Sequence, residues 1–173
     1  GDFERVKAAF DEFLHQLPFY GLAVLCVEDP EVAKLAQNVT RHMMCYGFGE
    51  KADVRASDVR QDGGAMRFTL HLPQGKPQEV RLNLPGRHNV LNALAAAAIG
   101  WQLGVPAESI AHALDNFQGI GRRFNIKGEL DFGRGKALLV DDYGHHPREL
   151  EAVFAAARGG WPDKRLVVAF QPH

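Results

Sequence analysis

The densest group of ionisable side chains in the sequence is VDDYGHHPREL, Val140–Leu150. Asp141 and Asp142 follow an apolar run that we interpret as a buried strand, and Pro147 suits the first turn of a helix. Ligands of open α/β sheets bind at the carboxyl ends of strands, and the N-termini of helices favour anionic groups. The segment therefore predicts a binding site between a strand and a helix.

Each polar side chain of this segment has a chemical use in such a site. A carboxylate can hold a ribose hydroxyl or a metal-bound water, while Tyr143, His145 and His146 can contact a sugar, a phosphate or a carboxylate. The structural alternative is that an aspartate caps the turn and a histidine fills a pocket. The segment does not predict a metal centre, because adjacent histidine side chains diverge and no further ligand stands at a usual spacing.

A second candidate site is PGRHNVLNALAAAA, Pro85–Ala98, where Gly86 can form the turn into a helix. His88 and Asn92 are four residues apart and Asn89 and Asn92 three apart, so their side chains are neighbours on one helix surface. An amide offers the donor and the acceptor that an adenine edge requires, and an imidazole can stack on the base. These residues predict a purine site, with ordinary capping and helix packing as the alternative.

A third candidate is GIGRRF, Gly119–Phe124, in which flexible backbone presents the guanidinium groups of Arg122 and Arg123. Guanidinium groups bind phosphate through several donors at once, so this segment predicts a phosphate contact. The alternative is a solvated or domain-pairing linker. The glycines at 119 and 121 also make this segment the best candidate for a domain boundary.

Three other chemistries have no motif in the 173 residues. There is no G-x-x-x-x-G-K-[ST] loop for a triphosphate, no G-x-S-x-G nucleophile elbow and no zinc-finger spacing. Any phosphate site within this sequence must therefore use other groups.

Composition predicts a soluble, cytoplasmic protein with a substantial core, since 46% of the residues are hydrophobic. With 20 basic and 21 acidic side chains, the net charge of −1 favours neither nucleic acid nor an anionic membrane as a partner.

Cys26 and Cys45 lie in apolar runs and are interpreted as small buried thiols in a reducing compartment. The absence of a leader or bilayer-length apolar run supports the cytoplasmic interpretation, and the start at Gly1 without methionine suggests an excised piece.

Hydrophobic periodicity predicts an α/β fold in two units. The first unit begins with helix 3–17, strand 21–29, a helix from Pro30 and strand 43–48. Strand 21–29 is expected to be buried on both faces, and this burial implies that the strands of the first unit pair in parallel. An antiparallel meander at 52–61, 65–72 and 79–84 and helices at 85–104 and 106–117 follow. After the glycine-rich linker, the second unit has strands 124–130 and 136–142, helix 146–160 and strand 165–170. That last strand would bring Gln171 and His173 to the same sheet edge as Asp142.

The order GRHNVLNALAAAA, GIGRRF, VDDYGHHPREL and FQPH resembles the Mur ligase family, and the likeness covers almost all of the chain. The resemblance implies three domains: a UDP-binding domain, a central P-loop ATPase domain and a C-terminal Rossmann-like domain. Residues 1–121 would be the later part of the central, ATP-binding domain, and residues 122–173 would begin the C-terminal domain. The implied reaction joins an amino acid to a nucleotide-linked muramoyl carboxylate with ATP and Mg2+, through an acyl phosphate, in peptidoglycan precursor synthesis.

The resemblance also implies residue roles, all of them in binding and orientation rather than covalent catalysis. His88, Asn89 and Asn92 match positions at the adenine of ATP, Arg123 with its neighbour Arg122 matches the phosphate position, and Asp142 matches the ribose position. Tyr143, His145 and His173 match positions that face the muramoyl substrate. Arg123 and His145 are the predicted catalytic residues, with Arg123 offsetting charge as the γ-phosphoryl group moves.

Within the family, the DYGHHP form looks most like the members that use L-alanine, so the resemblance implies L-alanine as the amino acid and UDP-N-acetylmuramate as the acceptor. The alternatives are a murein-recycling ligase that adds a preformed peptide to the same acceptor, and a non-catalytic nucleotide-binding module. Since the P-loop and the expected metal ligands lie outside these residues, the isolated piece is expected to be inactive. An unpaired sheet edge could also lead to self-association.

Overall fold

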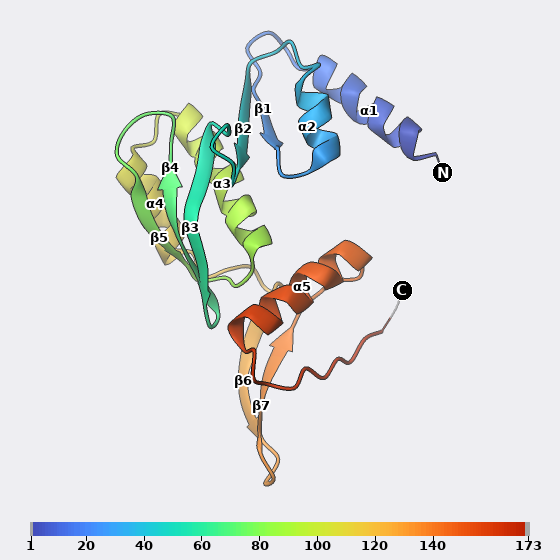
Figure 1. The fold of residues 1–173 in the computed structure, drawn as a ribbon, viewed down its shortest axis with the longest axis vertical. Coiled ribbons are helices and arrows are strands. Elements are labelled where there is room, and N and C mark those ends of the chain that lie inside the picture. Colours follow the sequence, from blue (N-terminus) through green and yellow to red (C-terminus); the bar gives the residue numbers. More distant parts are fainter. Residues whose placement is uncertain (1, 172–173) are drawn as a thin grey trace.

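A computed structural model describes residues 2–171 of the chain (Figure 1). The helices are α1 Phe3–His15, α2 Pro30–Ala36, α3 Arg87–Gln102, α4 Ala107–Asn116 and α5 Pro147–Gly160. The strands are β1 Ala23–Cys26, β2 Met43–Gly47, β3 Val54–Asp62, β4 Ala65–His71, β5 Gln78–Leu82, β6 Asn125–Asp131 and β7 Lys136–Asp141. The elements before Gly119 and the three after it, β6, β7 and α5, confirm the predicted α/β order.

The main sheet contains five strands in the order β1-β2-β3-β4-β5. β1 and β2 run parallel, as do β2 and β3, whereas β3, β4 and β5 pair antiparallel. The short Asp-Gly-Gly connection between β3 and β4 predicts this meander, because Gly63 adopts the positive φ of 54° that a tight hairpin needs. The parallel start and the antiparallel meander are therefore both confirmed.

The core lies between the meander and the helices α3 and α4, which contact the sheet and each other. Residues of β4 alternate between buried and partly exposed, so that Phe68 and Leu70 face the helices. The buried face of α3 contributes Leu94, Ala97 and Ala98, whose small alanine side chains let the helix approach the sheet closely. Burying a side chain such as Phe68 or Leu70 contributes roughly 1.5–3 kcal/mol to stability.

Two strands are less buried than predicted. In β1 only Ala23 is buried, because β1 is an edge strand with β2 on one side alone. β7 carries the residues before Asp142, yet it is exposed or half-buried along its length, and the side chain of Leu139 is 46% exposed. β7 pairs only with β6 in a two-stranded hairpin, so an apolar sequence does not suffice to bury it.

The predicted strand at 165–170 is wrong: the structure shows no strand there. Val167 is 74% exposed, and Phe170 is 48% exposed. An extended apolar segment becomes a strand only when a neighbour completes its hydrogen-bond ladder. Gln171 thus does not end a strand beside β7, and His173 lies outside the described residues.

Helix α5 connects the hairpin to the main sheet (Figure 1). On the sheet side, Gln61 in β3 donates a hydrogen bond from Nε2 to the carbonyl of Ala156 in α5 at 2.8 Å. On the hairpin side, the ring of Phe124, just before β6, stacks on the ring of Trp161, just after α5, with 5.9 Å between the ring centres. The hairpin of β6 and β7 projects at the opposite end of the molecule from α1.

Within residues 2–171, no helix has the length and apolar character that crossing a membrane requires.

Candidate functional site

A pocket of about 570 Å³ lies where the first turns of α3 and α5 face the segment 120–124. Its apolar wall consists of Leu82, Leu84, Ile120, Phe124, Ala152 and Val153. Its polar wall consists of His88, Asn89, Asn92, Arg123, Asp142, Arg148 and Glu149. Five residues predicted from three separate motifs therefore line one pocket: His88, Asn89, Asn92, Arg123 and Asp142.

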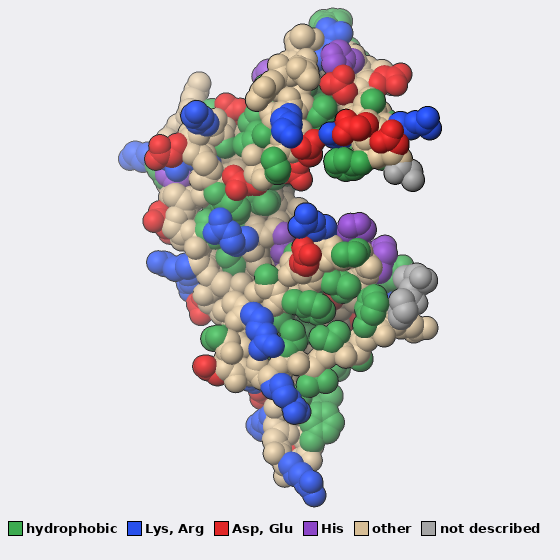
Figure 2. All heavy atoms as spheres, turned by 45° about the vertical axis from the view of Figure 1, so that its right-hand side comes forward, with side chains coloured by type: hydrophobic (Ala, Val, Ile, Leu, Met, Phe, Trp, Pro, Cys, Tyr) green, Lys and Arg blue, Asp and Glu red, His purple; other side chains and the backbone are tan. Residues whose placement is uncertain are grey.

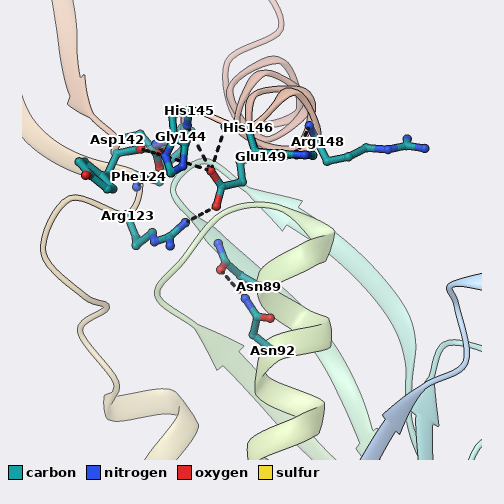
Figure 3. Close-up of polar contacts among 11 residues, drawn as sticks. Asn89, Asn92, Arg123, Phe124, Asp142, Gly144, His145, His146, Arg148 and Glu149 are labelled. Carbon is teal, nitrogen blue, oxygen red and sulfur yellow. Dashed lines mark hydrogen bonds and ion pairs between the residues drawn. The ribbon is translucent and has the colours of Figure 1, made fainter. Parts of the chain in front are cut away.

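The entry of α3 is shaped by Gly86, which adopts a φ of 95°. A Cβ at this position would lie 2.7 Å from the ring of His88, so the close approach of the ring requires glycine. Asn89 donates from Nδ2 to the Pro85 carbonyl at 2.8 Å, which makes it a local cap as well as a pocket residue. Asn92 donates from Nδ2 to Oδ1 of Asn89 at 3.4 Å, and its own side chain is exposed (Figure 3).

His88 is the partly buried ionisable group on the α3 side of the pocket. Burial lowers the pKa of its imidazole below 6.5; the charge of Asp142 raises that pKa, and the charge of Arg123 lowers it further. The ring is therefore neutral at neutral pH. A neutral imidazole has one donor and one acceptor nitrogen, or a flat face for stacking on an aromatic ligand.

Asp142 joins the end of β7 to the linker. Its Oδ2 accepts the backbone N–H of Phe124, and its Oδ1 accepts that of Gly144, both at 2.7 Å. Arg122 and Phe124 adopt positive φ values of 61° and 44°, an uncommon backbone conformation for residues with side chains. The carboxylate therefore stabilises a strained linker in addition to lining the pocket.

The two adjacent arginines have different surroundings. Arg123 lines the pocket, whereas the Arg122 guanidinium lies over the Tyr143 ring, 4.4 Å from its centre. The Tyr143 N–H donates to the Arg122 carbonyl at 2.9 Å, and the His145 ring meets the Tyr143 ring edge-on at 5.6 Å. Arg122, Tyr143 and His145 thus form a second group beside the pocket and do not line it.

Arg148 and Glu149 are the polar pocket residues that sequence reasoning missed, and Glu149 makes the closer contacts with the site. Its Oε2 accepts the backbone N–H groups of His145 and His146, both at 3.2 Å, and its Oε1 lies 3.5 Å from Nη1 of Arg123 (Figure 3). The hydrogen bonds from His145 and His146 lower the pKa of this carboxyl group below 4.5, and the charges of His145 and Arg123 lower it further. The N-terminus of α5 therefore already holds a carboxylate of its own.

A sequence signal for Glu149 existed. His146 caps α5, and its Nδ1 accepts the backbone N–H of Arg148 at 3.3 Å, while Glu149 at the third helical position reaches back to the cap. This is a capping box. It is hard to recognise because histidine replaces the serine or threonine that usually begins the motif.

The surface around α5 is hollowed. Figure 2 shows a notch between the part of the molecule formed by α1 and α2 and the part formed by α5. Basic, histidine and acidic side chains lie along the α5 side of the notch, and acidic and basic side chains lie together on the other side. Within the part of the chain that the structure describes, no three His, Cys, Asp or Glu side chains are grouped to hold a metal ion.

Comparison with known proteins gives consistent matches. The family model for the Mur ligase middle domain matches residues 1–100. The chain is 72% identical over 173 residues to a UDP-N-acetylmuramate–L-alanine ligase of Xanthomonas axonopodis pv. citri, covering 99% of this chain and 36% of that relative. The chain therefore spans about a third of the length of the relatives it matches.

Two solved structures have a similar fold. The UDP-N-acetylmuramate–alanine ligase MurC of Thermotoga maritima has a TM-score of 0.76 and 27% identity, and the match covers 100% of this chain and 37% of that one. MurF of Acinetobacter baumannii has a TM-score of 0.74 and 30% identity over 88% of this chain and 32% of that one. The fold thus agrees with the same group of proteins as the sequence match.

Proposed function

Because this chain belongs to the Mur ligase family, we propose that the full-length protein joins L-alanine to UDP-N-acetylmuramate with ATP, through an acyl phosphate, in peptidoglycan precursor synthesis. The observation that carries this proposal is the 72% identity to an L-alanine ligase over 99% of this chain. The pocket supports it, since amide, guanidinium and carboxylate groups from three motifs line one cavity. A cytoplasmic location belongs to the same proposal.

We propose that the pocket holds ATP between the two units. Asn89 and Asn92 offer amide groups to the adenine edge, and the neutral His88 offers a ring face or a hydrogen bond. Each carboxylate oxygen of Asp142 has two lone pairs, so each can accept a further hydrogen bond beside the one it accepts from the backbone. A ribose hydroxyl can donate that further hydrogen bond. The apolar wall suits the faces of the base and the sugar.

Arg123 is the proposed phosphate ligand and one of two proposed catalytic residues. Its guanidinium lines the pocket, 55% of its side chain is exposed, and it can direct several N–H donors at one phosphate. ATP supplies the phosphoryl group that activates the muramoyl carboxylate. Arg123 offsets the negative charge that shifts during this transfer, and electrostatic positioning is the main means of catalysis in such reactions.

The second group of residues is proposed to face the muramoyl substrate. The stacked Arg122 and Tyr143 form a flat polar surface, and His145 extends it beside the pocket. His145 is the second proposed catalytic residue, because its imidazole can orient the acceptor carboxylate near Arg123. The close contact of Arg122 with Tyr143 argues for a role on this side rather than at the nucleotide.

The domain division also stays a proposal: residues 1–121 as the later part of the ATP-binding domain and 122–173 as the start of the C-terminal domain. The pocket lies between these two parts, and the 119–123 linker joins them. Mg2+ is expected to act with ATP, and its ligands are proposed to lie mostly outside these residues.

Release of phosphate from ATP by the full-length protein tests the proposed function. With UDP-N-acetylmuramate as acceptor, we expect L-alanine-dependent release of one phosphate per product formed. A requirement for a preformed peptide in place of L-alanine would favour the recycling ligase, and ATP binding without any turnover would favour a non-catalytic module. The isolated 173-residue chain should bind nucleotide weakly at most and show no turnover; substantial ligation by it would contradict the proposal.

A further inference from the structure

Glu149 makes two different kinds of contact with its two carboxylate oxygens (Figure 3). Oε2 accepts the backbone N–H groups of His145 and His146, which caps the start of α5. Oε1 faces Nη1 of Arg123 at 3.5 Å, across the pocket wall. Oε2 also lies 3.7 Å from Nδ1 of the His145 ring, so the contact with Arg123 belongs to Oε1 and the contacts with the start of α5 belong to Oε2.

The position of Oε1 has the properties of a phosphate position. It is next to a guanidinium group and at the N-terminal end of a helix, and both features attract anions. We propose that Glu149 is a placeholder for the nucleotide phosphate: its Oε1 holds Arg123 while nucleotide is absent, and a phosphate oxygen replaces it when nucleotide binds. This inference rests on the proposed nucleotide site and adds a competing internal anion to it.

The geometry makes the ion pair displaceable. The two side chains are 55% and 34% exposed, and the single 3.5 Å contact is long for a charge-assisted hydrogen bond. An exposed pair of this kind contributes little stability, whereas a nucleotide phosphate offers more charge and more acceptor oxygens to the same guanidinium. Release of Oε1 leaves both backbone hydrogen bonds on Oε2 intact, so α5 stays capped.

The other basic residue of the pocket has a different partner. Arg148 contacts Glu151 through Nη1 at 3.2 Å, and Figure 3 shows its side chain extending away from Arg123. Arg123 is therefore the guanidinium that Glu149 controls. The Gln variant of Glu149 can separate its two roles, because a carboxamide oxygen can still accept both backbone N–H groups while the negative charge is lost.

The experiment is calorimetric titration of the full-length protein with ADP, adenosine and inorganic pyrophosphate. Compared with wild type, Glu149→Gln should bind ADP and pyrophosphate about two- to fivefold more tightly, as expected for freeing an arginine from an exposed ion pair. Adenosine affinity should not change, because adenosine has no phosphate. Glu129→Gln is the matched control: Glu129 pairs with Lys164 at 3.4 Å with similar exposure and lies outside the pocket, so its variant should match wild type with all three probes.

Each other outcome overturns the inference in a distinct way. Unchanged or weaker ADP and pyrophosphate binding by Glu149→Gln would mean that the carboxylate orients Arg123 for the phosphate or only caps α5. An equal gain for adenosine would indicate a general change in the pocket. Wild-type protein that binds neither ADP nor adenosine would contradict the proposed function. In that case the pyrophosphate titration still tests the placeholder separately. Equal pyrophosphate affinity of Glu149→Gln and wild type would refute the placeholder.

Discussion

Asp142 accepts a 2.7 Å hydrogen bond from the backbone N–H of Phe124, so the end of β7 is tied to the linker that carries Arg123. The same carboxylate accepts the N–H of Gly144 at the start of the turn into α5. One side chain thus determines the relative positions of the proposed phosphate ligand and the proposed acceptor-binding turn. Asp142 is consequently expected to act on the site through backbone geometry as well as through direct contact with a ribose.

Asp142→Asn tests this dual role. The variant replaces one acceptor oxygen by an N–H donor, which leaves a backbone N–H facing a donor at a cost of about 1–3 kcal/mol. We expect faster hydrogen exchange at Phe124 and Gly144 together with a higher KM for ATP. Asp141→Asn is the control, since Asp141 makes an exposed contact with Lys127 at 3.8 Å and is outside the pocket. A raised KM for ATP with unchanged hydrogen exchange at the Phe124 and Gly144 amides would mean that Asp142 acts only by direct contact with the ligand.

Gly86→Ala should disrupt the α3 entry. At a φ of 95°, alanine is strained, and its Cβ would lie 2.7 Å from the His88 ring. Gly75→Ala provides a matched comparison, because Gly75 has a φ of 97° with no atom within 4 Å of the added Cβ. We expect Gly75→Ala to cost about 1–2 kcal/mol of stability from backbone strain alone, and Gly86→Ala to cost more and to weaken ADP binding. Equal thermal destabilisation of the two variants would show that the His88 contact is readily relieved.

The parts of the fold that depend on local signals could be predicted from the sequence. The α3 helix, the meander and the α5 start follow from periodicity, turn glycines and Pro147, which act within a few residues. The convergence of His88, Arg123 and Asp142 was predicted only through the ordered family motifs, because no local pattern relates residues so distant in sequence. The pocket that brings them together confirms their proximity, while their roles stay predictions.

Other features depend on tertiary partners and could not be predicted. The apolar run at 165–170 is long enough for a strand, but a strand also requires a neighbour with free backbone groups, and none pairs with it in the described residues. The different surroundings of Arg122 and Arg123 follow from the positive φ of Arg122, which turns adjacent side chains in different directions. Glu149 was missed because the capping box it completes begins with a histidine, and because its contact with Arg123 joins α5 to the distant linker.

Substitution of the two arginines should separate their roles. Arg123→Ala removes the proposed phosphate ligand, and loss of a charge-assisted contact of about 1.5–3 kcal/mol predicts a roughly 10- to 100-fold lower kcat/KM for ATP. Arg122→Ala removes the stack on Tyr143, so it should mainly raise the KM for UDP-N-acetylmuramate. Steady-state kinetics with each substrate varied in turn measures both effects. Equal losses toward ATP in the two variants would contradict the separate assignments.

His88 should make stability depend on pH. Its pKa is lowered in the folded protein, chiefly by burial, with the charge of Asp142 opposing the shift and that of Arg123 adding to it. Below pH 6.5 the unfolded chain therefore binds a proton that the folded protein resists, and stability must fall as pH decreases from 6.5 toward the lowered pKa. The thermal midpoint of the full-length protein should drop more for wild type than for His88→Gln between pH 7.5 and pH 5.5. His112→Gln, at an exposed position on α4, should follow wild type, and parallel pH curves for all three proteins would contradict the burial effect at His88.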